Sequence, residues 1–174
     1  MRVYVDATTL IALGTVGELD LLHSFDGKLV VLPAVQDEVT TEPARTNVER
    51  FVERDDVKKQ DEVPDEVLEE AREVVGETDE NGDVQIVASV LARDETAVVS
   101  DDRRVRAVSR GFGATVTGTV GVVVRAVKEG TSAEEAKETV RRIDDNGLHM
   151  TAELREKAYG LVKETDDGHE ESSV

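Results

Sequence analysis

Five acidic residues stand at the ends of apolar runs or near the starts of expected helices: Asp6, Glu38, Asp83, Asp101 and Asp102. Asp6 ends the run VYVD, and the pair Asp101–Asp102 directly follows the run AVVS. In an open α/β sheet, ligands bind at the carboxyl ends of the strands. We therefore expect these acids, which are far apart in the sequence, to meet at one edge of a sheet.

Several carboxylates in one pocket repel one another, and a divalent cation reverses that effect because its charge dominates the local field. Oxygen ligands without His or Cys suit Mg²⁺ or Mn²⁺. One or two such ions can activate water and stabilise the leaving oxygen of a phosphodiester, which is nuclease chemistry. The alternative is that each acid is a solvated surface residue, because the chain holds 39 acids. Asp6 argues against this, since apolar residues flank it and an idle charge is costly there.

Other chemistries lack their residues. The string DATTL has no second Asp of a phosphatase motif, and Gly118-Thr119-Val120-Gly121 lacks the Lys of a P-loop. Cysteine is absent, which excludes disulfides, thiol nucleophiles and zinc ribbons.

Four short apolar or β-branched runs predict strands that a fold must bring together: residues 3–6, 29–32, 97–100 and 114–116. Unbroken apolar runs are typical of strands covered on both faces, as in a parallel sheet. A helical pattern follows each run, and this order predicts an α/β fold with a central parallel sheet. Pro33 suits the start of the helix after the second strand.

The chain divides into three parts by composition. We predict a domain over residues 1–130, within which residues 41–80 form an acidic helical arm, and a helical pair over residues 131–165. Ser132 and Glu135 have the spacing of a capping box at the start of that pair. The polar residues 166–174 predict a disordered tail.

The net charge is −18, with 39 acidic and 21 basic residues, and this balance by itself argues against a nucleic-acid partner. Excess carboxylates with few lysines also fit a halophilic organism, and at ~1 M salt the screening length is about 3 Å. Bulk repulsion from a polyanion then largely vanishes. No apolar run reaches 18 residues, so we expect no signal peptide and no membrane span, and a cytoplasmic protein.

Five segments together resemble the PIN-domain nucleases, and among these the VapC-like subgroup. They are VYVDATTLIAL (3–13), LPAVQDEV (32–39), GDVQIVASVLA (82–92), VVSDDRRVRAVSRGFGATVTGTVGVVVRAVKEG (98–130) and GLHMTAELREKAYGLV (147–162). The likeness covers nearly the whole chain except the arm and the tail. It implies a three-layer α/β/α sandwich with a parallel sheet and a ribonuclease site that uses Mg²⁺ or Mn²⁺.

The resemblance also implies roles for particular residues. The catalytic and metal-binding positions fall on Asp6, Glu38, Asp83 and the pair Asp101/Asp102. Asp83 stands where the subgroup often has Glu. The common T-x-D form favours Asp102, whereas the subgroup's own pattern favours Asp101, and both stay open. The substrate-binding candidates are Ser100, Arg103, Arg104 and Arg106. Ser100 occupies the family's hydroxyl position, which implies a bond to a carboxylate or to a metal-bound water, and the arginines have pairing to nearby acids as their alternative.

The leading hypothesis is a metal-dependent endoribonuclease that is the toxin of a toxin–antitoxin pair. Its partners would be RNA, a small antitoxin protein and a second copy in a homodimer. One alternative is a non-catalytic PIN-like module that binds RNA or protein, and another is an RNA-processing nuclease without an antitoxin.

Overall fold

Five parallel strands form a single sheet in the computed structural model, which describes residues 1–148 and 150–172, the side chains of Leu148 and of residues 169–172 excepted. The strand order is β3-β2-β1-β4-β5. Their bounds are β1 Arg2–Val5, β2 Lys28–Val30, β3 Val57–Lys58, β4 Thr96–Val99 and β5 Thr115–Thr117. Every neighbouring pair is parallel, as in the central pair that aligns Tyr4 with Val98.

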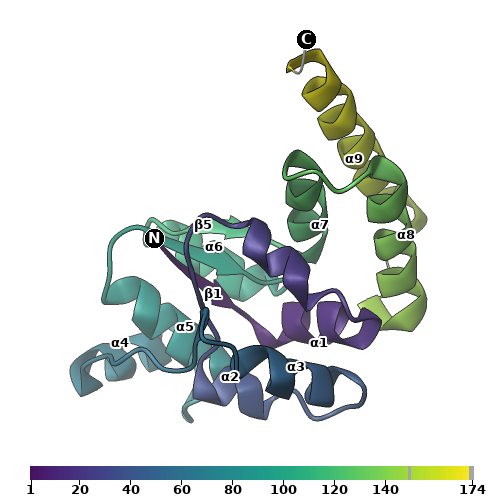
Figure 1. The fold of residues 1–174 in the computed structure, drawn as a ribbon. Helices are drawn as coiled ribbons and strands as arrows, with labels where there is room; N and C mark the ends of the chain where they lie inside the picture. Colours follow the sequence, from purple (N-terminus) through teal and green to yellow (C-terminus); the bar gives the residue numbers. More distant parts are fainter. Residues whose placement is uncertain (149, 173–174) are drawn as a thin grey trace.

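Helices flank this sheet, and the predicted α/β/α arrangement is confirmed (Figure 1). They are α1 Ala7–Val16, η1 Leu19–Ser24, α2 Pro33–Asp37, α3 Ala44–Val52, α4 Asp65–Val75, α5 Gly82–Leu91, α6 Arg103–Gly111, α7 Thr119–Lys128, α8 Ala133–Ile143, η2 Asp144–Leu148 and α9 Ala152–Ser172. α5 packs against α2, α4 and α6, whereas α1 packs against α3, α7 and α8. In Figure 1 α4 and α5 lie at the lower left, α6 lies beside β5, and α7 to α9 lie on the right.

The central strands are buried on both faces, which explains their unbroken apolar sequence. Val3, Tyr4, Val5, Val98 and Val99 are each at most 1% exposed. They belong to a hydrophobic core that continues into α1, α7 and α8. A second, smaller cluster joins α4 to α5. The core therefore holds the carboxyl ends of β1 and β4 rigidly side by side.

The segment of residues 41–80 contains more than the helices predicted for it. It holds α3 and α4, and between them β3 adds an edge strand to the sheet. β3 has two residues, of which Val57 is buried. A single apolar residue in a polar stretch gives no periodic signal, so the sequence did not reveal this strand.

Asp61 anchors the loop after β3 to the sheet. Its side chain is 1% exposed and receives a 2.5 Å hydrogen bond from the Tyr4 hydroxyl. Arg2, Lys58 and Arg93 pair with the same carboxylate at 3.3, 3.0 and 3.0 Å. Burial, together with the bond to Asp61, raises the pKa of Tyr4 to about 12. The loop is thereby fixed against β1 and the end of α5.

The C-terminal helices differ from the expectation only at their far end. Ser132 and Glu135 form the capping box that starts α8. α9 continues through residues 166–172, where the sequence predicted a disordered tail, and residues 173–174 lie outside the described residues. Across the described parts of the chain, no helix is both long and apolar enough to cross a membrane.

Candidate active site

Asp6 sits where β1 ends and caps the start of α1. The residue is 2% exposed, and its side-chain Oδ1 accepts a 2.8 Å hydrogen bond from the Ala7 backbone N–H. Its Oδ2 accepts bonds from the hydroxyls of Thr8 (2.8 Å) and Ser100 (2.6 Å). Thr8 lies in the first turn of α1 and supports Asp6 through this bond. Three donors therefore fix the orientation of this carboxylate.

Ser100 connects the carboxyl ends of β1 and β4. Besides donating to Asp6, its hydroxyl accepts a 3.0 Å bond from the backbone N–H of Asp102. The residue is 0% exposed. The hydroxyl both donates and accepts inside the protein, so it bonds a carboxylate as the resemblance implied, whereas contact of Ser100 with substrate stays a prediction.

Glu38 approaches the start of α5 from the end of α2. Its Oε1 accepts a 2.7 Å bond from the backbone N–H of Gly82. A Cβ atom at position 82 would lie 2.8 Å from this oxygen, so the close approach requires glycine. Burial raises the pKa of the Glu38 carboxyl, the negative charges of Asp6 and Asp83 raise it further, and the bond from Gly82 opposes them.

Asp83 belongs to the first turn of α5 and faces the same edge of the sheet. Burial raises the pKa of its carboxyl, and so do the charges of Asp6 and Asp102. The guanidinium of Arg104 opposes this shift through a 3.1 Å bond to Oδ2 of Asp83. Mutual electrostatic influence thus links Asp6, Glu38, Asp83 and Asp102, which come from four different elements.

The neighbouring residues Asp101 and Asp102 point to different surroundings. Asp102 caps α6, with Oδ1 accepting a 2.9 Å bond from the backbone N–H of Val105. Asp101 turns to the start of α7, where Oδ1 accepts a 2.9 Å bond from the Thr119 backbone and Oδ2 accepts from the Thr119 hydroxyl. A Cβ at Gly118 would lie 2.6 Å from Asp101 Oδ1, so glycine is needed for this approach too. Both oxygens of Asp101 are therefore occupied by α7.

The three arginines beside the site have different partners. Arg103 is exposed in the first turn of α6. Arg104 binds the carboxylates of Asp83 and Glu77, at 3.1 and 2.9 Å, so it already pairs with acids. Arg106 is half-buried, and its Nε has no hydrogen-bond partner.

The carboxylates offer a donor set that suits a hard divalent cation. Among the side chains that the structure describes, no three acidic or histidine side chains lie close enough together to coordinate an ion directly. Mg²⁺ usually keeps several waters and binds through one or two carboxylates, so it does not require such a cluster. In this part of the chain, Oε2 of Glu38, Oδ1 of Asp83 and Oδ2 of Asp102 have no hydrogen-bond donor. The residues present therefore fit Mg²⁺ or Mn²⁺ held partly through water.

Sequence reasoning missed the residues that support the acids. Thr8, Thr119 and Gly82 position Asp6, Asp101 and Glu38 respectively. The available signal was local: a hydroxyl two residues after Asp6, and a glycine at each of two helix starts, Gly82 before Asp83 and Gly118 before Thr119.

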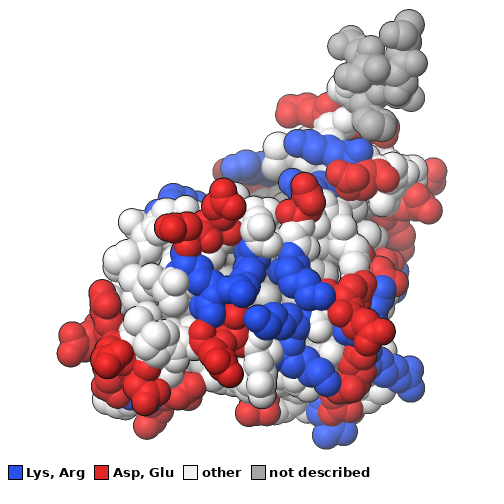
Figure 2. Space-filling model, turned by 60° about the vertical axis from the view of Figure 1, so that its left-hand side comes forward, with Lys and Arg blue, Asp and Glu red and all other residues white. Residues whose placement is uncertain are grey.

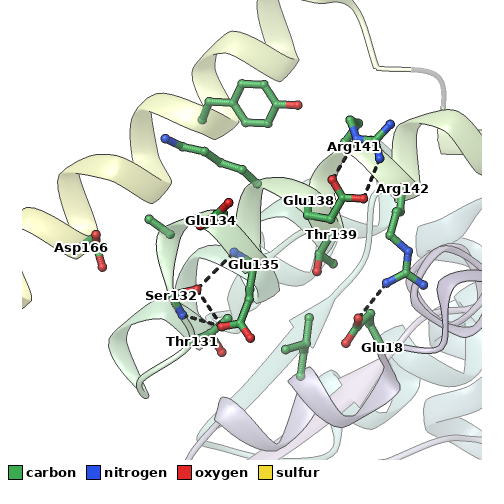
Figure 3. Close-up of a pocket in the computed structure, with 14 residues that line it drawn as sticks. Glu18, Thr131, Ser132, Glu134, Glu135, Glu138, Thr139, Arg141, Arg142 and Asp166 are labelled. Carbon is green, nitrogen blue, oxygen red and sulfur yellow. Dashed lines mark hydrogen bonds and ion pairs between the residues drawn. The ribbon is translucent and has the colours of Figure 1, made fainter.

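A large groove lies away from these acids, between η1, α8 and α9 (Figure 3). It is open and has a volume of about 1210 Å³. Charged side chains on its walls pair with one another, as Glu18 does with Arg142 at 3.0 Å and Glu138 with Arg141 at 2.6 Å. None of the five candidate acids lines it.

Comparison with known families gives one match. The model of a family described as a PIN domain matches residues 2–164. No curated protein matches the chain.

Proposed function

The chain belongs to the PIN-domain family, whose members are generally nucleases, and from this premise we propose that it is an endoribonuclease dependent on Mg²⁺ or Mn²⁺. One observation carries the proposal: at a single edge of the sheet, burial and the negative charges of Asp6 and Asp83 raise the pKa of Glu38, and burial and the charges of Asp6 and Asp102 raise the pKa of Asp83. Such repulsion between carboxylates has a cost that a bound cation would remove.

We assign the binding of the cation to Asp6, Glu38, Asp83 and Asp102, in part directly and in part through the water molecules that such an ion keeps. When bound, a divalent cation supplies positive charge beside the scissile phosphodiester. Asp6 is the most rigid of the four residues because three donors orient it, and since both of its oxygens are already bonded it would hold the cation through water. Rigid ligands favour catalysis, since the site then needs little reorganisation when substrate arrives.

The remaining polar residues act on the ligands or on the substrate. Ser100 and Thr8 position Asp6, and Arg104 positions Asp83 while limiting the repulsion around it. Arg103 is the exposed cation next to Asp102 in sequence, and we assign it a contact with an RNA phosphate.

We further propose that the protein is the toxin of a toxin–antitoxin pair, of the VapC-like subgroup, with a small antitoxin protein and a second copy of the chain as partners. The support is the sequence likeness of residues 98–130 and 147–162 to that subgroup. Expression should arrest growth of a host cell, and Asp6→Asn should relieve the arrest. If cells that express the active enzyme at a high level grow normally, the protein is not a toxin. The RNA-processing nuclease without an antitoxin is then the better interpretation.

Asp6→Asn should abolish cleavage of RNA while leaving the protein folded. Asparagine keeps the shape of the side chain, and the hydroxyls of Ser100 and Thr8 can accept as well as donate hydrogen bonds. Total RNA incubated at high salt with and without Mn²⁺, followed by mapping of the new ends, measures the loss. Mn²⁺ should raise the melting temperature of the wild type more than that of Asp6→Asn. A ligand stabilises the folded state in proportion to how tightly it binds that state, and the variant should bind Mn²⁺ more weakly.

The matched control is Asp26→Asn, which removes one negative charge at an exposed position outside the site. It should cleave RNA and respond to Mn²⁺ as the wild type does. Equal responses of all three proteins to Mn²⁺ would instead favour a non-catalytic module.

A further inference from the structure

A cavity of about 200 Å³ lies beside the proposed active site, and the nuclease activity does not account for it. It is lined by the turn from β2 to α2, the loop after β3, α4 and α5. Two of these segments lead to the proposed metal ligand Glu38. Pro33 in the cavity wall begins the helix that ends next to Glu38, and Gln85 lies one helical turn after Gly82, whose backbone N–H bonds the Glu38 carboxylate.

The cavity wall contains a buried hydroxyl that has no partner. Ser89 is 1% exposed, and its Oγ forms no hydrogen bond. Buried polar groups are nearly always hydrogen-bonded, and those that are not call for an explanation. Because Ser89 lines the cavity, a rotation of its side chain about the Cα–Cβ bond would bring the hydroxyl to a molecule inside, which would supply the missing bond.

Other polar groups of the cavity are already held in place. Gln85 accepts a 3.0 Å bond from the backbone N–H of Ala34 and donates a 2.6 Å bond to Glu80. Asp61 is satisfied by the donors that anchor its loop. The walls are therefore organised before any ligand arrives, which lowers the entropy cost of binding.

The lining selects a neutral, partly apolar ligand. Leu32, Pro33, Val63 and Leu68 provide apolar walls, and no Lys or Arg lines the cavity. With acids and no cations around it, the cavity disfavours a phosphate group. Its volume is below the roughly 300 Å³ at which pockets for drug-sized molecules begin. These properties fit a single flat heterocycle with an apolar face and a hydrogen-bonding edge.

We infer that this cavity binds a nucleobase of the RNA, from a nucleotide next to the cleaved bond, and that Ser89 hydrogen-bonds the edge of that base. The inference rests on the proposed ribonuclease function, which brings single-stranded RNA to this edge of the sheet. Proteins commonly read single-stranded RNA by taking up unstacked bases in this way. The cavity would then determine which base the enzyme prefers beside its cleavage site.

The test uses the full chain without metal and the four ribonucleosides as probes, followed by NMR shifts of the backbone amides. At least one nucleoside should shift the amides of Leu68 and Ser89, with a dissociation constant of about 1 mM. Ser89→Ala should weaken this binding about threefold to tenfold, and Val63→Trp, which fills the cavity, should abolish it. Ser109→Ala is the matched control, because Ser109 is also buried in a helix without a partner and lies outside the cavity.

A cleavage assay gives the second measurement. Ser89→Ala should alter the base preference at mapped cleavage sites while its affinity for Mn²⁺ stays that of the wild type. Equal nucleoside binding by Ser89→Ala and Ser109→Ala, or no shift of the cavity amides, would overturn the inference even if the enzyme cleaves RNA. Binding in the cavity without any cleavage would instead overturn the proposed function.

Discussion

At the scale of single residues, hydrogen bonding separates acids that look equivalent in the sequence. Asp101 and Asp102 are neighbours, yet Asp101 has both oxygens bound by Thr119 while Asp102 keeps one oxygen without a donor. Only Asp102 of the two contributes to the raised pKa of Asp83. We therefore propose Asp102 as the ligand and a structural role for Asp101.

Exchange of each acid for asparagine tests this assignment. Asp102→Asn should leave stability nearly unchanged, because asparagine caps a helix as well as aspartate does, and should lower the affinity for Mn²⁺. Asp101→Asn should lower the free energy of unfolding by about 1 kcal/mol, because it removes the negative charge that strengthens the two bonds from Thr119. Urea denaturation and calorimetric titration with Mn²⁺ measure the two effects. The reverse pattern would make Asp101 the ligand.

At the scale of elements, the contact between α2 and α5 places Glu38. The backbone of Gly82 donates to the Glu38 carboxylate, and Val35 packs close to the same glycine. α2 is short, so its end is held by this contact more than by its own hydrogen bonds. The start of α5 thus holds in place the proposed metal ligand Glu38, which belongs to the end of α2.

Gly82→Ala should move Glu38 without unfolding the protein. The new methyl group would lie 2.8 Å from the end of the Glu38 side chain, which is flexible and can swing away. Loss of such support typically lowers metal affinity about tenfold to a hundredfold. Calorimetric titration with Mn²⁺ measures this change. Gly111→Ala is the control, because nothing lies within 4 Å of a Cβ at that helical position, and its affinity should match that of the wild type.

At the scale of the whole molecule, the positions of the charged residues on the surface affect stability more than the net charge does. The net charge is −18, yet Figure 2 shows Lys and Arg gathered in a band across one face, with Asp and Glu on both sides. Acids also crowd single elements: Glu66, Glu70 and Glu73 follow one another on α4 at helical spacing, all exposed. Like charges at this spacing destabilise a helix.

Salt should therefore stabilise the protein. Raising KCl from about 0.1 to 1 M shortens the screening length from about 10 to 3 Å and weakens repulsion between exposed acids. The melting temperature should rise over this range. The double variant Glu70→Gln/Glu73→Gln should be more stable than the wild type at low salt and respond less to KCl. A variant with an unchanged response would show that the acids of α4 do not contribute.

The sequence by itself determined the elements and the location of the acids. Apolar runs predicted four of the five strands, and Asp6, Glu38, Asp83 and the pair 101–102 were identified because they stand at the ends of such elements. These features are local, because a strand that is buried on both faces consists almost entirely of apolar residues and can be recognised from its own sequence.

Only the tertiary structure decided what each side chain touches. It buried Ser100 beneath Asp6, joined Arg104 to Asp83, turned Asp101 towards α7 and opened a cavity beside Ser89. These contacts join residues far apart in the chain or depend on how helices pack, and periodicity carries no information about either. The edge strand β3 escaped prediction for a related reason, because its pairing with β2, and not its own composition, makes it a strand.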